Sequence, residues 1–364
     1  MWISRLNVQH CRVIHSAELA LTEHVNVLYG DNASGKSSLL EALAVLSRGR
    51  SFRTPRIAEV ITRGKNELTV AASVEQGVIL QSYPLGITKS AENTRIRINH
   101  ADVQQQAELS AHVPLTLIHP GSVELLTGSP TNRRAFLDWI AFYRFTEFNM
   151  AWRNYQRVLK QRNACLRDAK QRQALPQWTR QLIALQPILW RYRQDALTAL
   201  NAALQGCAEL LTALVPQLVL SSGFPAGIYP QDEQQLAQFF SEKTEQELKQ
   251  GFTLYGAHRA DLHILLEGIP ALRVASRGQL KILAVGLLLA QSHAIADDTT
   301  KRGIIAIDDL ASELDEQNQQ ALYNTLQTAQ QQLIITSTHH QPLKNWVNAA
   351  KVFQVKHGQV FAES

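Results

Sequence analysis

Hydrophobic and polar residues alternate along the first 30 positions of the chain, in the pieces WISRLNV, VIHSAELAL and HVNVLY. A period of two predicts β-strands, because successive side chains of a strand point to opposite faces. Similar pieces continue to PLTLIHP (114–120), which is apolar enough for a buried strand. The first third of the chain is therefore expected to be rich in strands.

The pattern changes at TNRRAFLDW, which begins at residue 131. From there to residue 215 the sequence is rich in Arg, Gln, Leu and Ala, with breaks at Pro176 and Pro216, and another helical stretch spans 231–250. Few turn signals over this length predict a helical arm. We expect residues 131–251 to form this arm, and residues 1–130 and 252–364 to form a head that is split in the sequence.

Strands and helices alternate again from residue 252 onward. The expected elements, in order, are a strand DLHILLEG, a helix RGQLKILAVGLLLAQSHAIA, a buried strand RGIIAIDD, a helix DEQNQQALYNTLQTAQQ, a strand QLIITST and a hairpin KVFQVKHGQVF. Ser276 is a plausible N-cap of the first helix, and His357-Gly358 is a hairpin turn signal. Strands that alternate with helices predict an α/β fold with a parallel sheet core.

Composition limits the class of protein. The chain has 364 residues, 45% of them hydrophobic, and a formal charge of +5 that permits nucleic-acid binding without demonstrating it. Cys11, Cys165 and Cys207 lack metal-binding spacing, so reduced thiols are expected. The longest apolar run, 282–290, is shorter than the roughly 20 residues that cross a bilayer, and the N-terminus lacks a signal-peptide core. We expect a cytoplasmic protein without a membrane partner.

Residues 30–37, GDNASGKS, match the phosphate-loop pattern GxxxxGK[ST] in full. A strand precedes them and an amphipathic helix follows. Glycines let backbone N–H groups surround a phosphate, Lys36 reaches the β- and γ-phosphates of ATP, and Ser37 offers its hydroxyl to Mg²⁺. The expected nucleotide contacts are Gly30, Asp31, Asn32, Ala33, Ser34, Gly35, Lys36, Ser37 and Ser38.

The apolar strand IIAI (304–307) ends in two carboxylates, Asp308 and Asp309. Open α/β sheets bind ligands at the carboxyl ends of their strands. We expect Asp308 to hold Mg²⁺, directly or through water, and Asp309 to polarise the attacking water. The alternative is a strand that leads into a solvated acidic turn.

The tract VASRGQLK (274–281) precedes this strand, and its place resembles the signature of ABC-type ATPases, which usually reads LSGGQ. That resemblance makes Ser276, Gly278 and Gln279 contacts to a nucleotide held by a partner's phosphate loop. An ordinary N-cap is the alternative. Two later positions also fit the series: Asp315 lies where this class has its D-loop, and His339, rather than His340, lies where it has its switch histidine.

Three further stretches indicate one family within the ABC-type ATPases. They are RGRSFRTPRIAEVI (48–61), GSPTNRRAFLDW (128–139) and YGAHRADLHI (255–264). Together with the motifs above, they resemble the RecF family of DNA replication and repair proteins over nearly the whole chain. The resemblance implies an ABC-type ATPase head related to SMC heads, with the helical arm inserted as a second lobe.

The same resemblance implies a function. It implies ATP-dependent, sequence-independent DNA binding in recombinational repair of single-strand gaps after DNA damage, within replication, recombination and the SOS response. ATP and Mg²⁺ would be the cofactors, ATP would drive homodimerisation, and DNA would stimulate weak hydrolysis. RecR and RecO would be partners in loading RecA on gapped duplex. The alternatives are the ATPase subunit of a membrane transporter and a phosphate-loop kinase outside the ABC class.

The sequence departs from the family pattern at several positions. Cys11-Arg12-Val13 replaces the usual aromatic-Arg-Asn, and Ala275 replaces the signature leucine. The Q-loop region reads IHPGS (118–122), without a glutamine or an acid. Asp309 stands where transporters usually carry Glu, and its shorter side chain fits a slow switch better than a pump.

Basic residues are concentrated in one part of the chain. Residues 131–173 contain ten Lys or Arg and three acidic residues, a net charge of +7, which leaves about −2 for the rest. Arg153, Arg157 and Lys160 share one face of a predicted helix, beside an apolar stripe of Trp152, Tyr155 and Leu159. We expect this face to contact DNA phosphates. A second candidate patch contains Arg48, Arg50 and Arg53.

Overall fold

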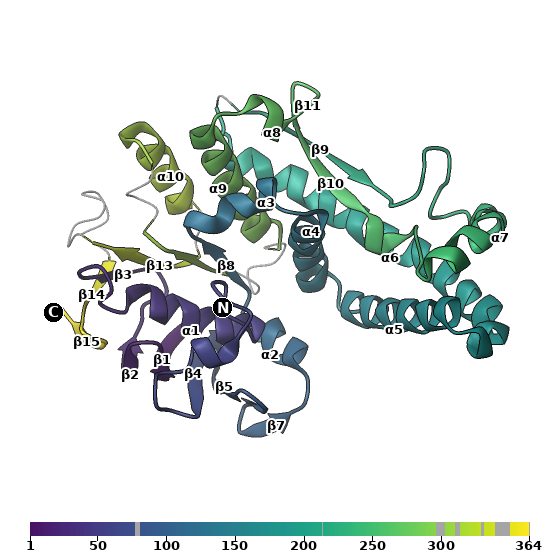
Figure 1. Ribbon diagram of the computed structural model, residues 1–364. Coiled ribbons are helices and arrows are strands. Elements are labelled where there is room, and N and C mark those ends of the chain that lie inside the picture. The colour runs from purple at the N-terminus through teal and green to yellow at the C-terminus, as the bar shows by residue number, and fades with distance from the viewer. Residues whose placement is uncertain are drawn as a thin grey trace. The chain divides into compact units, whose positions relative to one another are not determined.

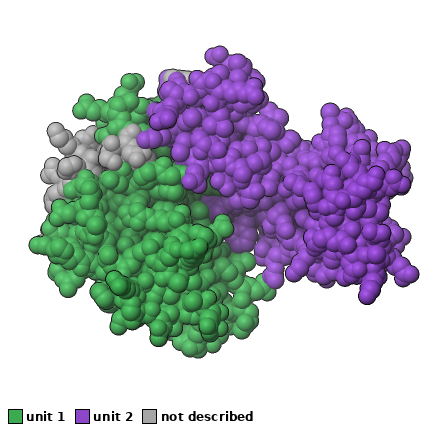
Figure 2. Space-filling view, in the orientation of Figure 1, with its two compact units in different colours: residues 1–122, 206–210, 285–364 green, residues 123–205, 211–284 purple. Residues whose placement is uncertain are grey.

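The structure, a computed structural model, describes residues 1–76, 81–212, 214–295, 303–309, 314–328, 331–338 and 350–363. The chain divides into two compact units (Figures 1 and 2). Unit 1 comprises residues 1–122, 206–210 and 285–364, and unit 2 comprises residues 123–205 and 211–284.

A six-stranded sheet in unit 1 has the order β15-β14-β3-β13-β12-β8. Its strands are β3 (Val25–Tyr29), β8 (Leu115–Ile118), β12 (Ile304–Ile307), β13 (Gln332–Ser337), β14 (Ala350–Lys356) and β15 (Gln359–Ala362). All neighbours pair in parallel except β14 and β15, which form the predicted hairpin. The parallel strands therefore end at one edge of the sheet, and β12 is buried throughout, as its apolar sequence predicted.

A second, antiparallel sheet in unit 1 has the order β2-β1-β4-β5-β6-β7. Its strands are β1 (Trp2–Cys11), β2 (Ile14–Ala20), β4 (Glu67–Gln76), β5 (Gln81–Ser90), β6 (Thr94–Ile98) and β7 (Ala101–Val103). Helix α1 (Lys36–Arg48) contacts strands of both sheets, and α2 (Gln106–His112) packs beside it. Apolar residues of α1 and of both sheets form one core, which explains why alternating and continuous apolar patterns both occur in this part of the chain.

Unit 2 is mainly helical, as predicted for the arm. Its long helices are α4 (Pro130–Arg144), α5 (Phe148–Arg167), α6 (Leu175–Leu204) and α7 (Glu233–Gln250), and α5 packs along α6 (Figure 1). Pro176 lies in the first turn of α6 and Pro216 begins a strand, so both breaks lie at element boundaries. A short helix, α3 (Glu124–Thr127), precedes α4. A short 3₁₀ segment, η3 (Ala169–Ala174), connects α5 to α6.

The boundary between the units differs from the expected one. Residues 252–284 were expected in the head, but the contacts place them in unit 2. The reason is that β10 (Asp261–Leu266) pairs antiparallel with β9 (Pro216–Ser221) and β11 (Ile269–Pro270), and packs against α4. DLHILLEG is thus a strand, as predicted, but it lies in a separate three-stranded sheet.

The signature tract follows that sheet. After α8 (Ala271–Val274), helix α9 (Arg277–Ala294) begins in unit 2 and ends in unit 1, and α10 (Glu316–Thr328) lies in unit 1. Cys11, Cys165 and Cys207 are buried and free. Within the described part of the chain, none of the helices combines the length and the apolar character that crossing a membrane requires.

Two buried arginines connect the helices of unit 2. Arg162 on α5 donates to Glu247 on α7 over 2.6 Å, and both side chains are fully buried. Arg193 on α6 donates to both carboxylate oxygens of Asp138 on α4 and to the carbonyl of Ala257. Buried charges are tolerated only when they are paired, and these pairs join α5 to α7 and α6 to α4.

Candidate functional site

The phosphate loop connects β3 to α1. Gly35 is the N-cap of α1 with φ of 119°, a conformation that glycine adopts without strain. Gly30 has no room for a side chain, since a Cβ would lie 2.1 Å from the carbonyl oxygen of Val355 on β14. The β14–β15 hairpin turn also contacts the phosphate loop: the N–H of Gly358 donates to the carbonyl oxygen of Ser34 over 2.8 Å. The loop is therefore fixed between neighbouring strands before any ligand arrives.

Lys36 lies at the centre of this loop. Its Nζ donates to the carbonyl oxygens of Gly30 and Asp31, over 2.6 and 2.8 Å. Burial lowers the pKa of Lys36, while the nearby carboxylates of Asp309, Asp308 and Asp31 act in the opposite direction. The ammonium group of Lys36 therefore lies inside the loop, at the place where the loop would surround a bound anion.

Ser37 and Asp308 meet although they are far apart in sequence. Ser37 Oγ donates to Asp308 Oδ1 over 2.8 Å, and Thr336 Oγ1 on β13 donates to the same oxygen over 2.8 Å. Asp308 is almost fully buried. The two predicted Mg²⁺ residues therefore lie together, and Thr336 is a third participant that the sequence did not single out.

Asp309 follows directly and has φ of 46°, in the left-handed region. Its N–H donates to Thr336 Oγ1 over 3.0 Å, so this threonine holds both acidic residues. The positive φ turns the backbone sharply between the two carboxylates. An extended strand would instead send adjacent side chains to opposite faces.

The residues present fit a triphosphate with Mg²⁺. The hydroxyl of Ser34 is buried inside the loop and has no hydrogen-bond partner among the described residues. The loop also provides an ammonium, the N-terminus of a thirteen-residue helix and a hydroxyl–carboxylate pair. These are the donors that phosphate oxygens require and the oxygen ligands that Mg²⁺ prefers.

The signature tract begins α9 as a capping box. Gln279 N–H donates to Ser276 Oγ over 3.2 Å, and Ser276 N–H donates to Gln279 Oε1 over 2.8 Å. The predicted N-cap role of Ser276 is confirmed. Ser276, Arg277 and Gly278 are exposed, and a Cβ on Gly278 would meet no heavy atom within 4 Å in the described part of the chain.

Of two other expected site residues, Asp315 is among the described residues and His339 is not. Asp315 caps α10: its carboxylate accepts from the N–H of Asn318 over 2.8 Å, so its side chain has a structural role in addition to the expected nucleotide role. His339 lies outside the described residues, as does His340.

The candidate DNA-binding residues fall into two groups. On α5, Arg153, Arg157 and Lys160 are exposed, while Tyr155 and Leu159 are buried, so this helix has the expected two faces. Trp152 stacks on Tyr155 with ring centroids 5.6 Å apart. In the other patch, Arg53 is exposed, but Arg48 is partly buried and donates to Leu115 O over 2.9 Å, a contact that stabilises the end of α1.

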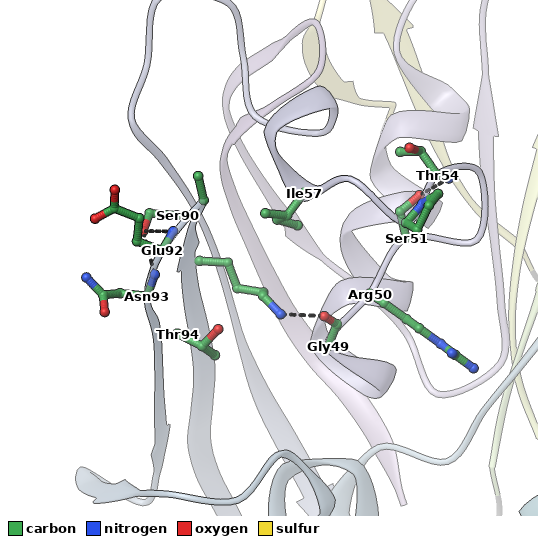
Figure 3. Close-up of a pocket in the computed structure, with 12 residues that line it drawn as sticks. Gly49, Arg50, Ser51, Thr54, Ile57, Ser90, Glu92, Asn93 and Thr94 are labelled. Carbon is green, nitrogen blue, oxygen red and sulfur yellow. Dashed lines mark hydrogen bonds between the residues drawn. The ribbon is translucent and has the colours of Figure 1, made fainter. Parts of the chain in front are cut away.

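A small cavity of about 190 Å³ lies at the C-terminal end of α1. Gly49, Arg50, Ser51 and Thr54 line one side, and Ser90, Glu92, Asn93 and Thr94 line the other (Figure 3). Lys89 donates to Gly49 O over 2.6 Å. The phosphate loop lies at the opposite end of this helix, about 20 Å away by helix rise, so the cavity is separate from the nucleotide site.

Comparisons with known proteins support one family. Residues 2–360 match the model of the RecF/RecN/SMC N terminal domain. The chain is 34% identical to the DNA replication and repair protein RecF of Proteus mirabilis and 35% identical to that of Vibrio vulnificus, and each match covers 99% of both chains.

Solved structures share the fold. A structure of the recombination mediator protein RecF with ATP, in the RecFOR pathway, matches with a TM-score of 0.86 at 23% identity and covers 100% of this chain and 98% of that one. The Smc head domain derived from Pyrococcus furiosus, bound to the C-terminal domain of ScpA, matches with a TM-score of 0.58 at 14% identity, over 100% and 96% of the two chains.

Proposed function

The chain belongs to the RecF family of DNA replication and repair proteins, and we propose that it binds DNA in an ATP-dependent manner in the repair of single-strand gaps. The observation that carries this proposal is the pairing of Ser37 with Asp308 beside a complete phosphate loop. This pairing brings the two halves of an ATPase site together from opposite ends of the chain.

ATP with Mg²⁺ would supply a phosphoanhydride bond, and hydrolysis of this bond would return the protein from its ATP-bound form to the form that releases DNA. Residues 30–38 would hold the phosphates, and Ser37 and Asp308 would hold the metal. Asp309 would orient the attacking water, and His339 would act as the switch histidine. A carboxylate as short as Asp309 leaves more distance to the water than Glu would, which favours weak turnover that DNA stimulates.

The proposed active form is a homodimer in which each nucleotide contacts Lys36 of one protomer and Ser276 of the other. Gly278 supports this arrangement. Glycine is a poor helix former, by about 1 kcal/mol relative to alanine in a helix interior. Among the described residues, however, no atom excludes a Cβ at Gly278, and its φ is not positive. A second molecule that closely approaches the start of α9 would explain it.

DNA would bind through its backbone and without sequence preference. The exposed basic face of α5, with Arg153, Arg157 and Lys160, supports this proposal. A related protein is described as a recombination mediator of the RecFOR pathway. By analogy we propose RecR and RecO as partners and the loading of RecA on gapped DNA as the outcome.

The test is cosedimentation with a gapped DNA duplex, with ATP and without nucleotide, at low and moderate salt. The proposal expects binding that ATP strengthens and that salt weakens. A transporter ATPase subunit would share the nucleotide site but would have no use for the arm's basic face. A failure to bind DNA at low salt would refute the proposal.

A further inference from the structure

An exposed basic loop follows α1. Arg50, Arg53 and Arg56 are exposed, and we call residues 50–56 the basic loop. Three guanidinium groups within seven residues suit a polyanion such as the DNA backbone. Ser51 and Phe52, which lie between Arg50 and Arg53, make contacts inside unit 1: Ser51 with Glu41 and Phe52 with His119.

Ser51 makes the first inward contact. Its hydroxyl donates to Glu41 of α1, a carboxylate that is fully buried and is also held by both Nε and Nη2 of Arg12 over 2.9 Å. Ser51 Oγ accepts from the N–H groups of Arg53 and Thr54, so it also shapes the loop itself. The base of the basic loop is therefore tied to the helix that begins at the phosphate loop.

Phe52 makes the second inward contact. Its ring lies against the ring of His119, with centroids 4.8 Å apart, and it packs on the main core of unit 1. Arg53 places its guanidinium 5.8 Å from the same phenyl ring, a cation–π distance. One aromatic ring thus lies between an exposed arginine, Arg53, and a partly buried histidine, His119.

His119 stands beside the acidic strand end. Ile118 and Ile307 are register partners on parallel strands, and Asp308 N–H donates to Ile118 O over 2.8 Å. His119 and Asp308 are therefore the next residues on adjacent strands, about 5 Å apart by strand spacing.

The His119 ring has little freedom to move. Its Nδ1 accepts from Gly121 N–H over 3.1 Å, and His119 N–H donates to Ser122 Oγ over 2.9 Å in the same tight turn. A Cβ on Gly121 would lie 2.8 Å from His119 Cε1, so the ring already touches the turn. Because the Phe52 ring contacts this ring and the turn holds its Nδ1 edge, a shift of Phe52 changes the packing of His119.

We propose that Phe52 is a positioning residue that couples DNA contact at Arg53 to ATP hydrolysis at Asp308, through the ring of His119. This inference rests on the proposed function. A DNA phosphate that binds Arg53 competes with the phenyl ring for the guanidinium and redirects the loop. The phenyl ring follows, and His119 adjusts the strand end at which Asp308 and Asp309 lie.

The test uses Phe52→Leu, which keeps an apolar side chain on the core but removes the ring. A matched control is Tyr83→Leu, because Tyr83 meets a histidine, His112, edge to face in the same unit with ring centroids 5.4 Å apart. His112 precedes β8, whereas His119 follows it beside the acidic strand end. ATP turnover is measured with and without gapped DNA, and DNA affinity with and without ATP. Phe52→Trp, which restores an aromatic face, serves as the rescue.

Phe52→Leu is expected to keep basal turnover and DNA affinity within about twofold of wild type, while the ratio of turnover with DNA to turnover without it falls to about 1. ATP should also lose its effect on DNA affinity, because coupling between binding sites is reciprocal. Tyr83→Leu and Phe52→Trp should retain both effects.

Normal coupling in Phe52→Leu would overturn the inference and leave the proposed function standing. Equal loss of coupling in Tyr83→Leu would also overturn it, because the effect would then be a general loss of packing. A wild-type protein that shows no coupling in either direction would refute both the inference and the DNA-stimulated part of the proposed function.

Discussion

Ser37 Oγ and Asp308 Oδ1 are joined by a 2.8 Å hydrogen bond although 271 positions separate the two residues in the chain. The bond exists because β3 and β12 flank β13 in one parallel sheet, and their carboxyl ends meet at the same edge. Thr336, at that edge of β13, donates to the same carboxylate oxygen. The site thus gathers groups from three adjacent strands and the segments that follow them: Thr336 on β13, Asp308 after β12, and Ser37 in α1 after β3.

Substitutions at the two halves of this site should separate ATP binding from hydrolysis. Lys36→Ala removes the ammonium inside the phosphate loop and is expected to lose ATP binding. Asp308→Asn can still accept hydrogen bonds from Ser37 and Thr336 but lacks the charge that Mg²⁺ needs, so turnover should fall on the order of 10- to 100-fold while ATP still binds. Fluorescent-nucleotide titration and phosphate release measure the two effects.

The control is Asp195→Asn, which removes an exposed carboxylate on α6. It should bind and hydrolyse ATP as wild type does. If Asp308→Asn hydrolysed ATP at the wild-type rate, the metal role of Asp308 would be wrong.

The local sequence pattern predicted the parts of this site that depend on few neighbours. Glycine spacing and a lysine determine the phosphate loop, and four buried apolar residues before two acids determine the strand end. Thr336 was not predicted, because a threonine in a β-strand is common and its role depends on strand order. Glu41 was missed for the same reason: only the fold shows that its partner is Arg12.

His258 should make stability depend on pH. Burial lowers its pKa to about 4, while Tyr155 donates toward Nδ1 and Thr253 O lies 3.1 Å from Nε2. In the unfolded chain a histidine pKa is about 6.5, so the unfolded state takes up protons first as pH falls. The free energy of unfolding should therefore decrease from about pH 6.5 down to about pH 4.

Urea denaturation of wild type and His258→Gln measures this contribution. Between about pH 7 and about pH 5, wild type should lose on the order of 2 kcal/mol more than the variant. Parallel pH profiles for the two proteins would show that His258 is not the group responsible.

Replacing only one partner of the buried ion pair between Arg162 and Glu247 should lower the free energy of unfolding strongly. Glu247→Gln leaves the guanidinium buried without a countercharge, although Thr179 and Thr253 still accept from it. We expect a loss of about 3–5 kcal/mol in the free energy of unfolding, measured by urea denaturation. Asp102→Asn, which breaks an exposed pair with Arg95 and Arg97, should have little effect. Similar effects from both substitutions would contradict this account.

The basic face of α5 should determine how DNA binding responds to salt. Replacing Arg153 and Arg157 together with alanine is expected to reduce the slope of log affinity against log salt by about 2 if both contact phosphates. Fluorescence anisotropy across a salt series measures the slope. Arg180→Ala with Lys249→Ala removes the same charge from exposed positions elsewhere in unit 2 and should leave the slope nearly unchanged. Equal slopes for both double variants would indicate a general charge effect.

The boundary of the arm was harder to predict than the arm itself. Periodicity identified the long helices, and the buried side of α5 follows the predicted apolar stripe. Residues 252–284 were placed in the head because DLHILLEG has the pattern of a core strand. One of its partners is β9, a six-residue strand that follows a long helical stretch, and no local signal in the sequence shows that pairing. The stretch GSPTNRRAFLDW indicated the family, but only the fold shows that Arg133 pairs with Asp261 at the start of β10.

The most direct test of the central claim, that each ATP site uses Ser276 of a second molecule, is light scattering of wild type, Ser276→Arg and Asp232→Arg in ADP and in ATP. Asp232 caps α7 as Ser276 caps α9, so this control separates the loss of a cap from the loss of a contact between molecules. We predict that ATP, but not ADP, doubles the mass of wild type and Asp232→Arg, whereas Ser276→Arg binds ATP and stays at the mass of one chain. A Ser276→Arg protein that dimerises normally in ATP would contradict the claim.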